Sequence, residues 1–577
     1  MLYKKKYDLW VSSEYLDEGT KEELKNIKDE KEIEDRFYKE LEFGTGGLRG
    51  IMGAGTNRMN IYTVGRATQG LAKYILKYYG EKASVSIACD SRNMSKEFSE
   101  RAASVLCGNN IRVNLFESLR PTPMLSYAVR YLGSKVGIVV TASHNPKQYN
   151  GYKVYGEDGA QFTDKGSEEI LSYIKEIKNF SDVKVLDLEE SRQKGLLNII
   201  GEEVDNSYIE KVKALTIREE LVKNHANDLK IIYTPIYGSG NIPVRRVLSE
   251  LGYENLSVVK EQELPNGNFP TVPYPNPEQP AVFKLALEMA KEQNPDIIFG
   301  TDPDCDRIGV VVKDKCGEYR VLTGNQTGIL LTYYIVSSLK DLNKLPSNGA
   351  VIKTIVTSEM VRAVTNDFNV EIMDVLTGFK YIGEKIKEFE ESKSHTYLFG
   401  YEESYGCLAG TFVRDKDAVV GAALICEMAL YYKSKGMSLY DALIELYQKY
   451  GFYKEDIISI ELAGKEGQEK IQKAIEYLRI SSPSSINGIK ISKKMDYKLS
   501  IEQNLYNSTK KDIELPKSNV LRFILEDRSW FIVRPSGTEP KMKVYVSVVG
   551  YNLEDADGKM EEFKKNVMKV IDESYKC

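Results

Sequence analysis

Three aspartates spaced by two residues, Asp302, Asp304 and Asp306, lie in the segment DPDCDR between two apolar runs. In an extended chain alternate side chains point to one side, so the three carboxylates are expected to converge. Carboxylates this close repel one another. A hard divalent cation offsets the repulsion and keeps coordination sites for water or a phosphate oxygen. An EF-hand needs glycine and glutamate where this segment has Arg307 and Lys313. The alternative is an acidic turn in solvent, which the flanking apolar runs disfavour.

A candidate nucleophile lies in TASHNPKQYNGYK, which places Ser143, His144 and Lys153 after the apolar run VGIVV. Ligands bind at the carboxyl ends of strands in open α/β sheets, so Ser143 is well placed for chemistry. Ser143 and His144 should point to opposite sides of an extended chain, which disfavours a direct serine and histidine pair. The Asn-Gly dipeptide that follows marks a turn, which would hold Ser143 on a defined loop with Lys153 returning past it. The alternative is that Ser143 is only a turn residue.

Two glycine-containing segments carry groups suited to an anion, FGTGGLRG and RPSGTEPK. In the first, no lysine followed by serine or threonine closes the loop, and Arg49 breaks the GxGxxG register, so neither nucleotide motif fits. Backbone N–H groups around the glycines and the Arg49 guanidinium can still contact an anion. The second is expected on a turn between two strands, where several side chains around Gly537 can donate to a phosphate: Arg534, Ser536, Thr538 and Lys541. A plain hairpin turn is the alternative for this segment.

Two further segments suit a sugar phosphate. GYEESYG follows the apolar run TYLF, so Glu402 and Ser404 lie two residues apart, on the same side, just past a predicted strand. A carboxylate beside a hydroxyl can bind sugar hydroxyl groups. TGFKYIG places Lys380 on a predicted turn, where it suits a phosphate and is equally acceptable as a surface lysine.

Alternating strands and helices must position these segments. Short β-branched runs alternate with helix-like stretches, at residues 84–89, 136–141, 230–234, 296–300 and 350–354. This alternation predicts α/β units with largely parallel strands. The first forty residues have the spacing of amphipathic surface helices, and the chain from Gly451 has the pattern of a smaller α+β domain. The prolines from Pro265 to Pro280 predict an ordered loop, and the apolar run from Ala418 predicts a buried helix.

Length and composition exclude several classes of protein. A chain of 577 residues exceeds what one hydrophobic core usually supports, so several domains are predicted. The 79 basic and 84 acidic residues leave a net charge of −5, which gives no general attraction for nucleic acid. Nucleic acid is therefore not predicted as a partner. A membrane is not predicted either, because no apolar run reaches the ~18 residues of a membrane helix. Seven cysteines without a CxxC pair predict a reduced, cytoplasmic setting.

Together these segments resemble the motifs of the α-D-phosphohexomutase superfamily, and specifically its phosphoglucomutase branch, which also contains phosphopentomutases. Four segments match the family's serine, metal, sugar and phosphate loops, in the family's order: TASHNP, DPDCDR, GYEESYG and RPSGTEPK. The resemblance implies an α/β fold of four domains around a central cleft, three of them mixed α/β and the last a smaller α+β domain. The domains that carry these four loops are expected, in that order, at residues 1–207, 208–322, 323–450 and 451–577.

The resemblance also implies roles for individual residues. Ser143 would carry a phosphoryl group, and Mg²⁺ would be held by it together with Asp302, Asp304 and Asp306. Lys153 would act as acid and base, and Arg307 would bind phosphate beside Ser143. The other candidates are Arg49 and His144 for catalysis, Glu402, Ser404 and Lys380 for the sugar, and Arg534, Ser536, Gly537 and Thr538 for the substrate's second phosphate.

The implied reaction interconverts glucose 1-phosphate and glucose 6-phosphate through a phosphoserine enzyme. Glucose 1,6-bisphosphate would be the intermediate and activator, with Mg²⁺ as the cofactor and a sugar phosphate as the only predicted partner. Mannose and pentose phosphates are alternative substrates, and a Mg²⁺-dependent sugar phosphatase or a silent sugar-phosphate-binding protein are alternative functions. Cys305 stands where the family usually has Ala or Gly, and Tyr401 stands where many members have Gly. Tyr401 leaves the sugar preference open, and no oligomeric state is predicted.

Overall fold

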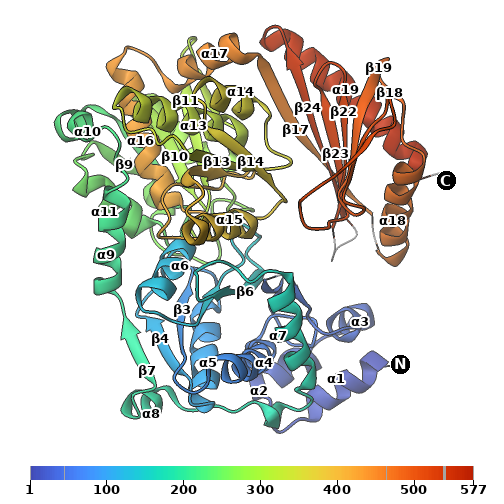
Figure 1. The fold of residues 1–577 in the computed structure, drawn as a ribbon. Coiled ribbons are helices and arrows are strands. Elements are labelled where there is room, and N and C mark those ends of the chain that lie inside the picture. Colours follow the sequence, from blue (N-terminus) through green and yellow to red (C-terminus); the bar gives the residue numbers. More distant parts are fainter. Residues whose placement is uncertain (1, 45, 463, 537–540, 576–577) are drawn as a thin grey trace. The chain divides into compact units, whose positions relative to one another are not determined.

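A computed structural model describes residues 2–44, 46–462, 464–536 and 541–575 of the chain. The chain divides into two compact units, which are described separately below (Figure 1). The first unit combines residues 1–324 with 382–438, and the second combines residues 325–381 with 439–577. The domain boundaries expected from the sequence stay predictions.

Three short amphipathic helices begin the first unit: α1 (Leu2–Ser12), α2 (Glu18–Lys25) and α3 (Glu30–Phe37). The carboxylates of Asp17 and Asp29 accept hydrogen bonds from the first turns of α2 and α3, which explains where these helices begin. Their apolar faces bury Trp10 and Phe37 together with Tyr62 of the next helix, in a small core of their own. The predicted amphipathic helices at the start of the chain are therefore confirmed.

The largest sheet of the first unit has seven strands in the order β1-β2-β6-β5-β3-β4-β7. They are β1 (Phe43–Gly44), β2 (Gly47–Ile51), β3 (Ser84–Cys89), β4 (Arg112–Phe116), β5 (Val136–Val140), β6 (Tyr149–Gly156) and β7 (Leu197–Ile200). Its helices are α4 (Ile61–Tyr79), α5 (Ser95–Gly108), α6 (Thr122–Tyr131), α7 (Asp164–Glu176), the short η1 (Phe180–Asp182) and α8 (Leu188–Gln193). α4 and α5 pack side by side and bury the apolar side chains of β3, β4 and β5. The predicted glycine-rich loop near Arg49 is wrong in detail, because its described residues form the β1 and β2 hairpin.

A second sheet of this unit has the order β12-β11-β10-β8-β9. Its strands are β8 (Ile231–Thr234), β9 (Leu256–Val258), β10 (Ile297–Thr301), β11 (Ile308–Lys313) and β12 (Tyr319–Val321). Its helices are α9 (Glu202–Lys213), α10 (Glu219–His225), η2 (Ala226–Asp228), α11 (Asn241–Glu250), η3 (Lys260–Gln262), η4 (Pro280–Phe283), α12 (Lys284–Gln293) and α16 (Ala418–Ser434). α16 packs on β10 and β11 and is buried along most of its length, as predicted. Residues 263–279 form no helix or strand, which confirms the proline-rich loop.

The predicted predominance of parallel strands is wrong where the loops of interest lie. β3, β4, β5 and β7 are parallel neighbours, but β6 pairs antiparallel with β5, and β11 pairs antiparallel with β10. β15 (Thr396–Tyr401) and β16 (Cys407–Leu408) form a third antiparallel pair. In each case the connection is a short loop, and only antiparallel strands can be joined by one, since a parallel crossover needs a dozen or more residues. The serine, metal and sugar loops are therefore the turns of hairpins.

In the second unit, β13 (Gly349–Thr354) and β14 (Glu371–Val375) pair in parallel, near α13 (Gly324–Asp341), α14 (Met360–Asp367) and α17 (Leu439–Tyr450). α15 (Phe379–Ser392) begins in this unit and continues into the first. The remainder is an antiparallel sheet of β17 (Phe452–Glu461), β18 (Ser485–Ile486), β19 (Ile489–Asp496), β20 (Ile501–Asn504), β21 (Lys510–Asp512), β22 (Leu521–Leu525), β23 (Trp530–Pro535) and β24 (Lys541–Gly550). α18 (Gly464–Ile480) and α19 (Leu553–Ser574) pack against this sheet over an apolar core (Figure 1). The predicted α+β C-terminal domain is confirmed.

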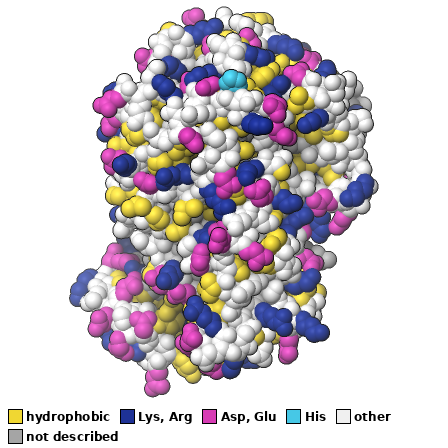
Figure 2. All heavy atoms as spheres, turned by 90° about the vertical axis from the view of Figure 1, so that its left-hand side faces the viewer, with side chains coloured by type: hydrophobic (Ala, Val, Ile, Leu, Met, Phe, Trp, Pro, Cys, Tyr) yellow, Lys and Arg dark blue, Asp and Glu magenta, His cyan; other side chains and the backbone are white. Residues whose placement is uncertain are grey.

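Basic and acidic side chains are interspersed over the face of the molecule drawn in Figure 2. Among the described residues, no helix is long and apolar enough to cross a membrane. The cysteines in the described part of the chain are free thiols: Cys89, Cys107, Cys305, Cys316, Cys407 and Cys426.

The N-terminus of α16 contains a buried carboxylate, Asp417. Its side chain accepts hydrogen bonds from the backbone N–H groups of Val419 and Val420, at 2.9 and 3.0 Å. The Tyr208 hydroxyl lies 2.8 Å from both of its oxygens. Burial raises the pKa of Asp417 to about 6, despite the hydrogen bonds that favour the charged form. The backbone N–H of the next residue, Ala418, donates to the carbonyl of Cys305, so this cap also supports the DPDCDR loop.

We expect the difference in thermal midpoint, Asp417→Asn minus wild type, to increase as pH rises from 4 to 7. In the wild type the raised pKa contributes stability that is complete at acid pH and is lost as pH rises through about 6. The full effect is ~3 kcal/mol, because each pKa unit corresponds to about 1.4 kcal/mol. Thermal scans across this pH range measure it, with Asp29→Asn at the exposed cap of α3 as the matched control. A pH-independent difference between Asp417→Asn and wild type would contradict the assignment.

Candidate active site

Ser143 lies just past β5 in an unusual backbone conformation. Its φ is 52°, in the left-handed region, and its backbone N–H donates to the Thr141 hydroxyl at 2.7 Å. Its Oγ donates to Asp302 Oδ2 at 2.7 Å and lies 3.1 Å from His144 Nδ1. The side chain is buried, so this hydroxyl is held between a carboxylate and an imidazole.

The prediction that Ser143 and His144 do not pair is therefore wrong. It assumed an extended chain, in which neighbouring side chains diverge, whereas the left-handed backbone at Ser143 brings the two side chains to the same side. Burial, together with the nearby guanidinium groups of Arg307 and Arg49, holds the pKa of His144 well below its usual range. His144 is thus a neutral imidazole at physiological pH, and one of its nitrogens can accept the Ser143 proton.

The three aspartates converge as predicted, although not for the predicted reason. One carboxylate oxygen from each of Asp302, Asp304 and Asp306 lies within 4.8 Å of the others, and all three residues are buried. The loop between β10 and β11 is a turn rather than an extended chain, with φ of 52° at Cys305. Asp302 Oδ1 accepts hydrogen bonds from the backbone N–H groups of Asp306 and Arg307, which fixes the turn. Cys305 is fully buried.

The donor set of this cluster fits a divalent cation. Asp304 Oδ1 and Asp306 Oδ1 are buried and have no hydrogen-bond partner, which is costly for carboxylate oxygens unless a cation binds them. Burial and the two neighbouring carboxylates raise the pKa of Asp302 well above its usual range. Burial opposes ionisation of Asp306 as well, but the ammonium groups of Lys416 and Lys153 keep its pKa below its usual range. Three hard oxygen ligands suit Mg²⁺, Ca²⁺ or Mn²⁺ better than zinc.

Two buried lysines border the cluster. Lys153 lies on β6 together with Asn150 and Gly151, so the turn predicted at this Asn-Gly pair is wrong. The Lys153 ammonium donates to Asp304 Oδ2 at 2.8 Å and to Asp306 Oδ2 at 3.4 Å. Burial favours the neutral amine, but the charges of Asp304 and Asp306 raise the pKa of Lys153. Lys416, which the sequence analysis did not single out, lies 3.3 Å from Asp306 Oδ2 and 3.0 Å from Asp415 Oδ1. Both ammonium groups are therefore held at the aspartates.

Arg307 and Arg49 approach the serine loop from two elements. The Arg307 guanidinium donates to Glu278 Oε1 at 2.6 Å, and Glu278 belongs to the proline-rich loop. Arg49 on β2 donates to Asn145 Oδ1 at 3.3 Å. Both contribute positive charge at His144, the neighbour of Ser143 in the serine loop. The structure thus brings together Ser143, His144, Lys153, Arg49, Arg307 and the three aspartates.

A buried arginine that the sequence analysis missed holds the serine loop. Arg92, just past β3, donates to the backbone carbonyls of Ser143, Asn145, Pro146 and Tyr149. It forms an ion pair with Asp90, whose other contacts include the Thr141 hydroxyl at 2.6 Å. The ring of Phe269, in the proline-rich loop, lies 5.1 Å from the guanidinium carbon. Arg92 therefore satisfies the carbonyls of a loop whose backbone must stay in a strained conformation.

The sugar loop belongs to the same unit. Glu402 is buried, and its backbone N–H donates to the Gly406 carbonyl, which closes a turn after β15. Its charge acts on Arg307 and Lys416, which places the carboxylate near the phosphate-binding and acid/base candidates. Ser404 lies on the same turn and is partly exposed. Tyr401 is buried and stacks on Phe399, with 5.8 Å between the ring centroids, so its side chain faces the protein interior.

The other predicted residues belong to the second unit. Lys380 lies in the first turn of α15 rather than on a turn between elements, and its ammonium lies 5.0 Å from the Tyr381 ring centroid. Arg534 lies on β23 and donates to the Tyr545 hydroxyl at 3.4 Å. The Ser536 N–H donates to the Lys541 carbonyl, as expected at a turn between strands. Gly537 and Thr538 lie outside the described residues. The expectation that these residues act with the first unit's cluster stays a prediction.

Comparisons with known proteins agree with this geometry. Family models described as phosphoglucomutase/phosphomannomutase match four stretches: alpha/beta/alpha domains I, II and III at residues 40–181, 206–317 and 323–450, and the C-terminal domain at residues 499–553. A phosphoglucomutase from Staphylococcus saprophyticus is 35% identical over 563 residues, which cover 98% of this chain and 99% of that protein. The chain belongs to the phosphoglucomutase/phosphomannomutase family.

Two solved structures of the phosphoglucomutase/phosphomannomutase family share the fold. A member of that family from Burkholderia thailandensis has a TM-score of 0.66 at 16% identity, over 92% of this chain and 97% of that one. The Paramecium exocytosis-sensitive phosphoprotein parafusin, a phosphoglucomutase, has a TM-score of 0.68 at 16% identity, over 93% and 95%. The resemblance inferred from the four loops and the implied mixed α/β architecture are confirmed.

Proposed function

We propose that the chain is a phosphoglucomutase that interconverts glucose 1-phosphate and glucose 6-phosphate through a phosphoserine at Ser143. The observation that carries the proposal is a buried serine hydroxyl 2.7 Å from Asp302, in a cluster of three carboxylates bordered by Lys153 and Arg307. The phosphoglucomutase relative covers nearly the whole chain, which supports the same substrate. Mannose and pentose phosphates stay alternative substrates, because the family models, described as phosphoglucomutase/phosphomannomutase, do not select one sugar.

The reaction would proceed in two transfers. In the first, the bond between Ser143 Oγ and phosphorus breaks while a bond forms between phosphorus and the free sugar hydroxyl oxygen. The hydroxyl proton passes to a base, for which Lys153 Nζ is the candidate, and the leaving Ser143 Oγ takes up a proton through His144, so that glucose 1,6-bisphosphate and the free serine hydroxyl result. After the bisphosphate turns over, Ser143 Oγ takes the other phosphoryl group, and the released sugar oxygen regains a proton.

Individual side chains would divide this work. Asp302, Asp304 and Asp306 would hold Mg²⁺, which would supply positive charge to the transferring phosphoryl oxygens. Arg307 would bind a phosphoryl oxygen, and neutral His144 would accept the Ser143 proton when that hydroxyl attacks. Glu402 and Ser404 would bind sugar hydroxyls.

The second phosphate of the substrate would be bound in the C-terminal domain. Arg534 and Ser536 are its described candidates, with Gly537 and Thr538, and Lys380 would add a positive charge from α15. The four domains at 1–207, 208–322, 323–450 and 451–577 would contribute one loop each. The family models support this division, because each matches within or close to one of these ranges. A cytoplasmic location stays the expectation from the cysteine pattern.

A substrate panel tests the proposal. Purified chain with Mg²⁺ and a trace of glucose 1,6-bisphosphate should convert glucose 1-phosphate to glucose 6-phosphate, detected with a coupled dehydrogenase. Mannose 1-phosphate and ribose 1-phosphate, in parallel, report the alternative substrates. Faster conversion of either one than of glucose 1-phosphate would contradict the assignment of glucose.

The same reactions separate a mutase from a phosphatase. A mutase must keep water away from the phosphoserine, so inorganic phosphate should appear far more slowly than the isomer. Phosphate release that outpaces isomer formation would establish a sugar phosphatase instead. Sugar phosphate binding without either product would establish a silent binding protein.

Replacing Asp304 by asparagine should weaken Mg²⁺ binding by roughly tenfold or more, because one charged ligand oxygen is lost from a three-carboxylate site. Phosphoryl transfer should fall with it, whereas sugar phosphate binding should be partly kept. Calorimetric titration of Mg²⁺ measures the affinity, with Asp228→Asn as the matched control, since Asp228 pairs with His225 at the surface. Equal Mg²⁺ affinity in Asp304→Asn and wild type would remove Asp304 from the ligand set.

A further inference from the structure

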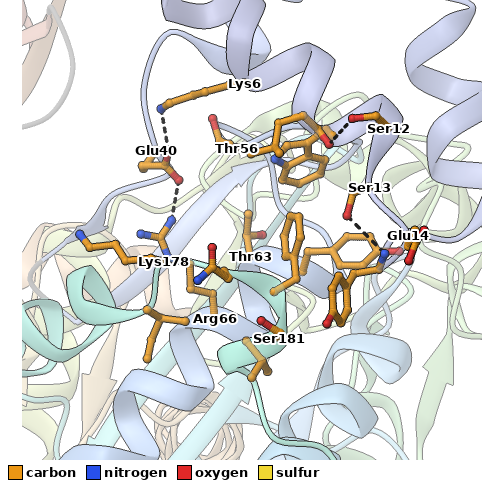
Figure 3. A pocket seen from close by; sticks show the side chains of 18 of the residues that line it. Lys6, Ser12, Ser13, Glu14, Glu40, Thr56, Thr63, Arg66, Lys178 and Ser181 are labelled. Carbon is orange, nitrogen blue, oxygen red and sulfur yellow. Dashed lines mark hydrogen bonds and ion pairs between the residues drawn. The ribbon is translucent and has the colours of Figure 1, made fainter.

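A pocket separate from the catalytic cluster lies in the first unit, between the N-terminal helices and the domain that contains the seven-stranded sheet. Its volume is about 860 Å³, within the range of pockets that hold small molecules. Its walls come from α1, the turn after it, the first turns of α4 and residues 175–183 (Figure 3). None of the residues proposed above for catalysis lines it. Domain I of the family model begins at residue 40, so the α1 wall lies outside that model.

The floor of this pocket is aromatic. The rings of Trp10, Tyr62 and Phe180 contact one another edge to face, with centroids 5.4 to 5.8 Å apart. The Tyr62 hydroxyl donates to Asp17 Oδ2 at 2.7 Å, which fixes the buried ring in place. Leu9 and Tyr15 also line the pocket and expose 64% and 63% of their surface. Trp10 and Tyr62 are themselves buried, so a planar apolar group would cover Leu9, Tyr15 and the half-buried ring of Phe180 and remove their apolar surface from water.

Positive charge gathers at one side of the pocket. Lys6 and Arg66 both donate to the Glu40 carboxylate, at 2.6 Å each. One negative charge therefore neutralises only one of these two positive charges. Figure 3 shows Lys6, Arg66 and Lys178 on the same side of the pocket as Glu40, with Glu14 on the other side. Within the described part of the chain, the Lys178 ammonium forms no ion pair. This side of the pocket therefore has an excess of positive charge in a chain whose net charge is −5.

The neutral polar groups of the pocket are mostly used by the protein itself. The hydroxyls of Ser12, Thr56 and Thr63 donate to backbone carbonyls, and the Ser13 hydroxyl accepts from the Tyr15 N–H. Few of these groups can bind an uncharged polar ligand without losing an existing bond. The cationic side chains are the polar groups that remain able to bind a ligand, and they favour an anion.

We propose that this pocket binds an aromatic anion, a planar ring that carries a phosphate group at one end, as a nucleoside monophosphate does. The ring lies over the exposed side chains of Leu9 and Tyr15 and the half-buried ring of Phe180, and the phosphate faces Lys6, Arg66 and Lys178. Glu14, on the opposite side, suits an amino or hydroxyl donor on the ring. The ligand binds outside the catalytic cluster, so binding does not depend on the function proposed above.

Tryptophan fluorescence offers a local test, since the chain has two tryptophans and Trp10 forms part of the floor. In a Trp530→Phe background Trp10 becomes the single reporter. We expect AMP and UMP to quench its emission in a saturable way, and adenosine and inorganic phosphate, which each lack one half of the ligand, to fail at the same concentrations. The two nucleotides distinguish a preference for the base from recognition of a ring and a phosphate alone. Equal quenching by adenosine and AMP, or no quenching by either nucleotide, would overturn the proposal.

Charge reversal at the rim tests the phosphate side. Lys178→Glu should raise the AMP dissociation constant by about fivefold or more, while Lys82→Glu, at an exposed lysine outside the pocket, should leave it unchanged. If Trp530→Phe does not fold, calorimetric titration of AMP into the full chain and into these two variants gives the same comparison. AMP affinity that responds equally to the two substitutions would overturn the proposal, as would loss of binding when glucose 1,6-bisphosphate saturates the catalytic site.

Discussion

Replacing Ser143 by alanine should lower glucose phosphate interconversion by roughly a thousandfold or more, because the residue that accepts and returns the phosphoryl group is lost. The substitution removes one buried oxygen and its hydrogen bond to Asp302, so the fold and the carboxylate cluster should be kept. Intact-mass measurement of the wild type after incubation with glucose 1,6-bisphosphate should show one added phosphoryl group on the Ser143 peptide. The variant should show none.

A matched control is available close by. Ser91, just past β3, also has a buried hydroxyl, and that hydroxyl has no hydrogen-bond partner. Ser91→Ala makes the same chemical change without touching the cluster, so its turnover should stay within about twofold of wild type. Near-normal turnover of Ser143→Ala, or a phosphoryl group found on another peptide, would show that Ser143 is not the nucleophile.

The strands and the loops after them could be predicted from sequence because they depend on local patterns. A β-branched run followed at once by polar residues places those residues at the carboxyl end of a strand, and Ser143, Asp302 and Glu402 are all found there. Buried charge is informative for a related reason. Three carboxylates between two apolar strands cannot all be solvated, so their convergence follows from the flanking sequence whether the loop is extended or turned.

The side-chain directions could not be predicted, because they depend on backbone angles that the residue types do not specify. Ser143 and Cys305 both have φ of 52°, although neither is glycine or asparagine, the residues that usually adopt this conformation. At Ser143 the conformation is stabilised by the Thr141 hydroxyl, two residues away, and by the Arg92 guanidinium, 51 residues away. The pairing with His144 therefore depends in part on a distant residue that no local pattern connects to the serine loop.

Of the site residues absent from the sequence analysis, one follows a local pattern and another depends on distant packing. Arg92 follows the apolar run of β3, and the rule that selected Ser143 and Asp302 would also have selected it. Lys416 lies in the charged run RDKD, which has the composition of a solvated turn. Asp415 is its neighbour in sequence, but its distant partner Asp306 comes close only when β11 and α16 pack together. The pocket at Trp10 is less predictable still, because its walls come from segments that sequence patterns do not place side by side.

Arg92→Lys should separate the geometry of the serine loop from the chemistry of the serine. Lysine keeps the charge, but its ammonium cannot reach four carbonyls at once, so at least one carbonyl of the loop loses its partner, at a cost of about 1–3 kcal/mol. The lysine would also lose the planar contact with Phe269. We expect a thermal midpoint lower by roughly 5 °C, and a kcat at least about tenfold lower at temperatures well below that midpoint, with KM changed less.

The expected loss of kcat arises because Ser143 Oγ would no longer be held 2.7 Å from Asp302, so phosphorylation by glucose 1,6-bisphosphate should slow in proportion. Arg101→Lys is the matched control, since Arg101 is a partly buried arginine on α5 whose buried Nε has no hydrogen-bond partner. That variant should lose stability and keep its kcat. If Arg92→Lys keeps kcat within about twofold of wild type below its midpoint, the left-handed backbone at Ser143 does not depend on Arg92. The Thr141 hydroxyl and Asn150 on β6 would then have to hold the loop without it.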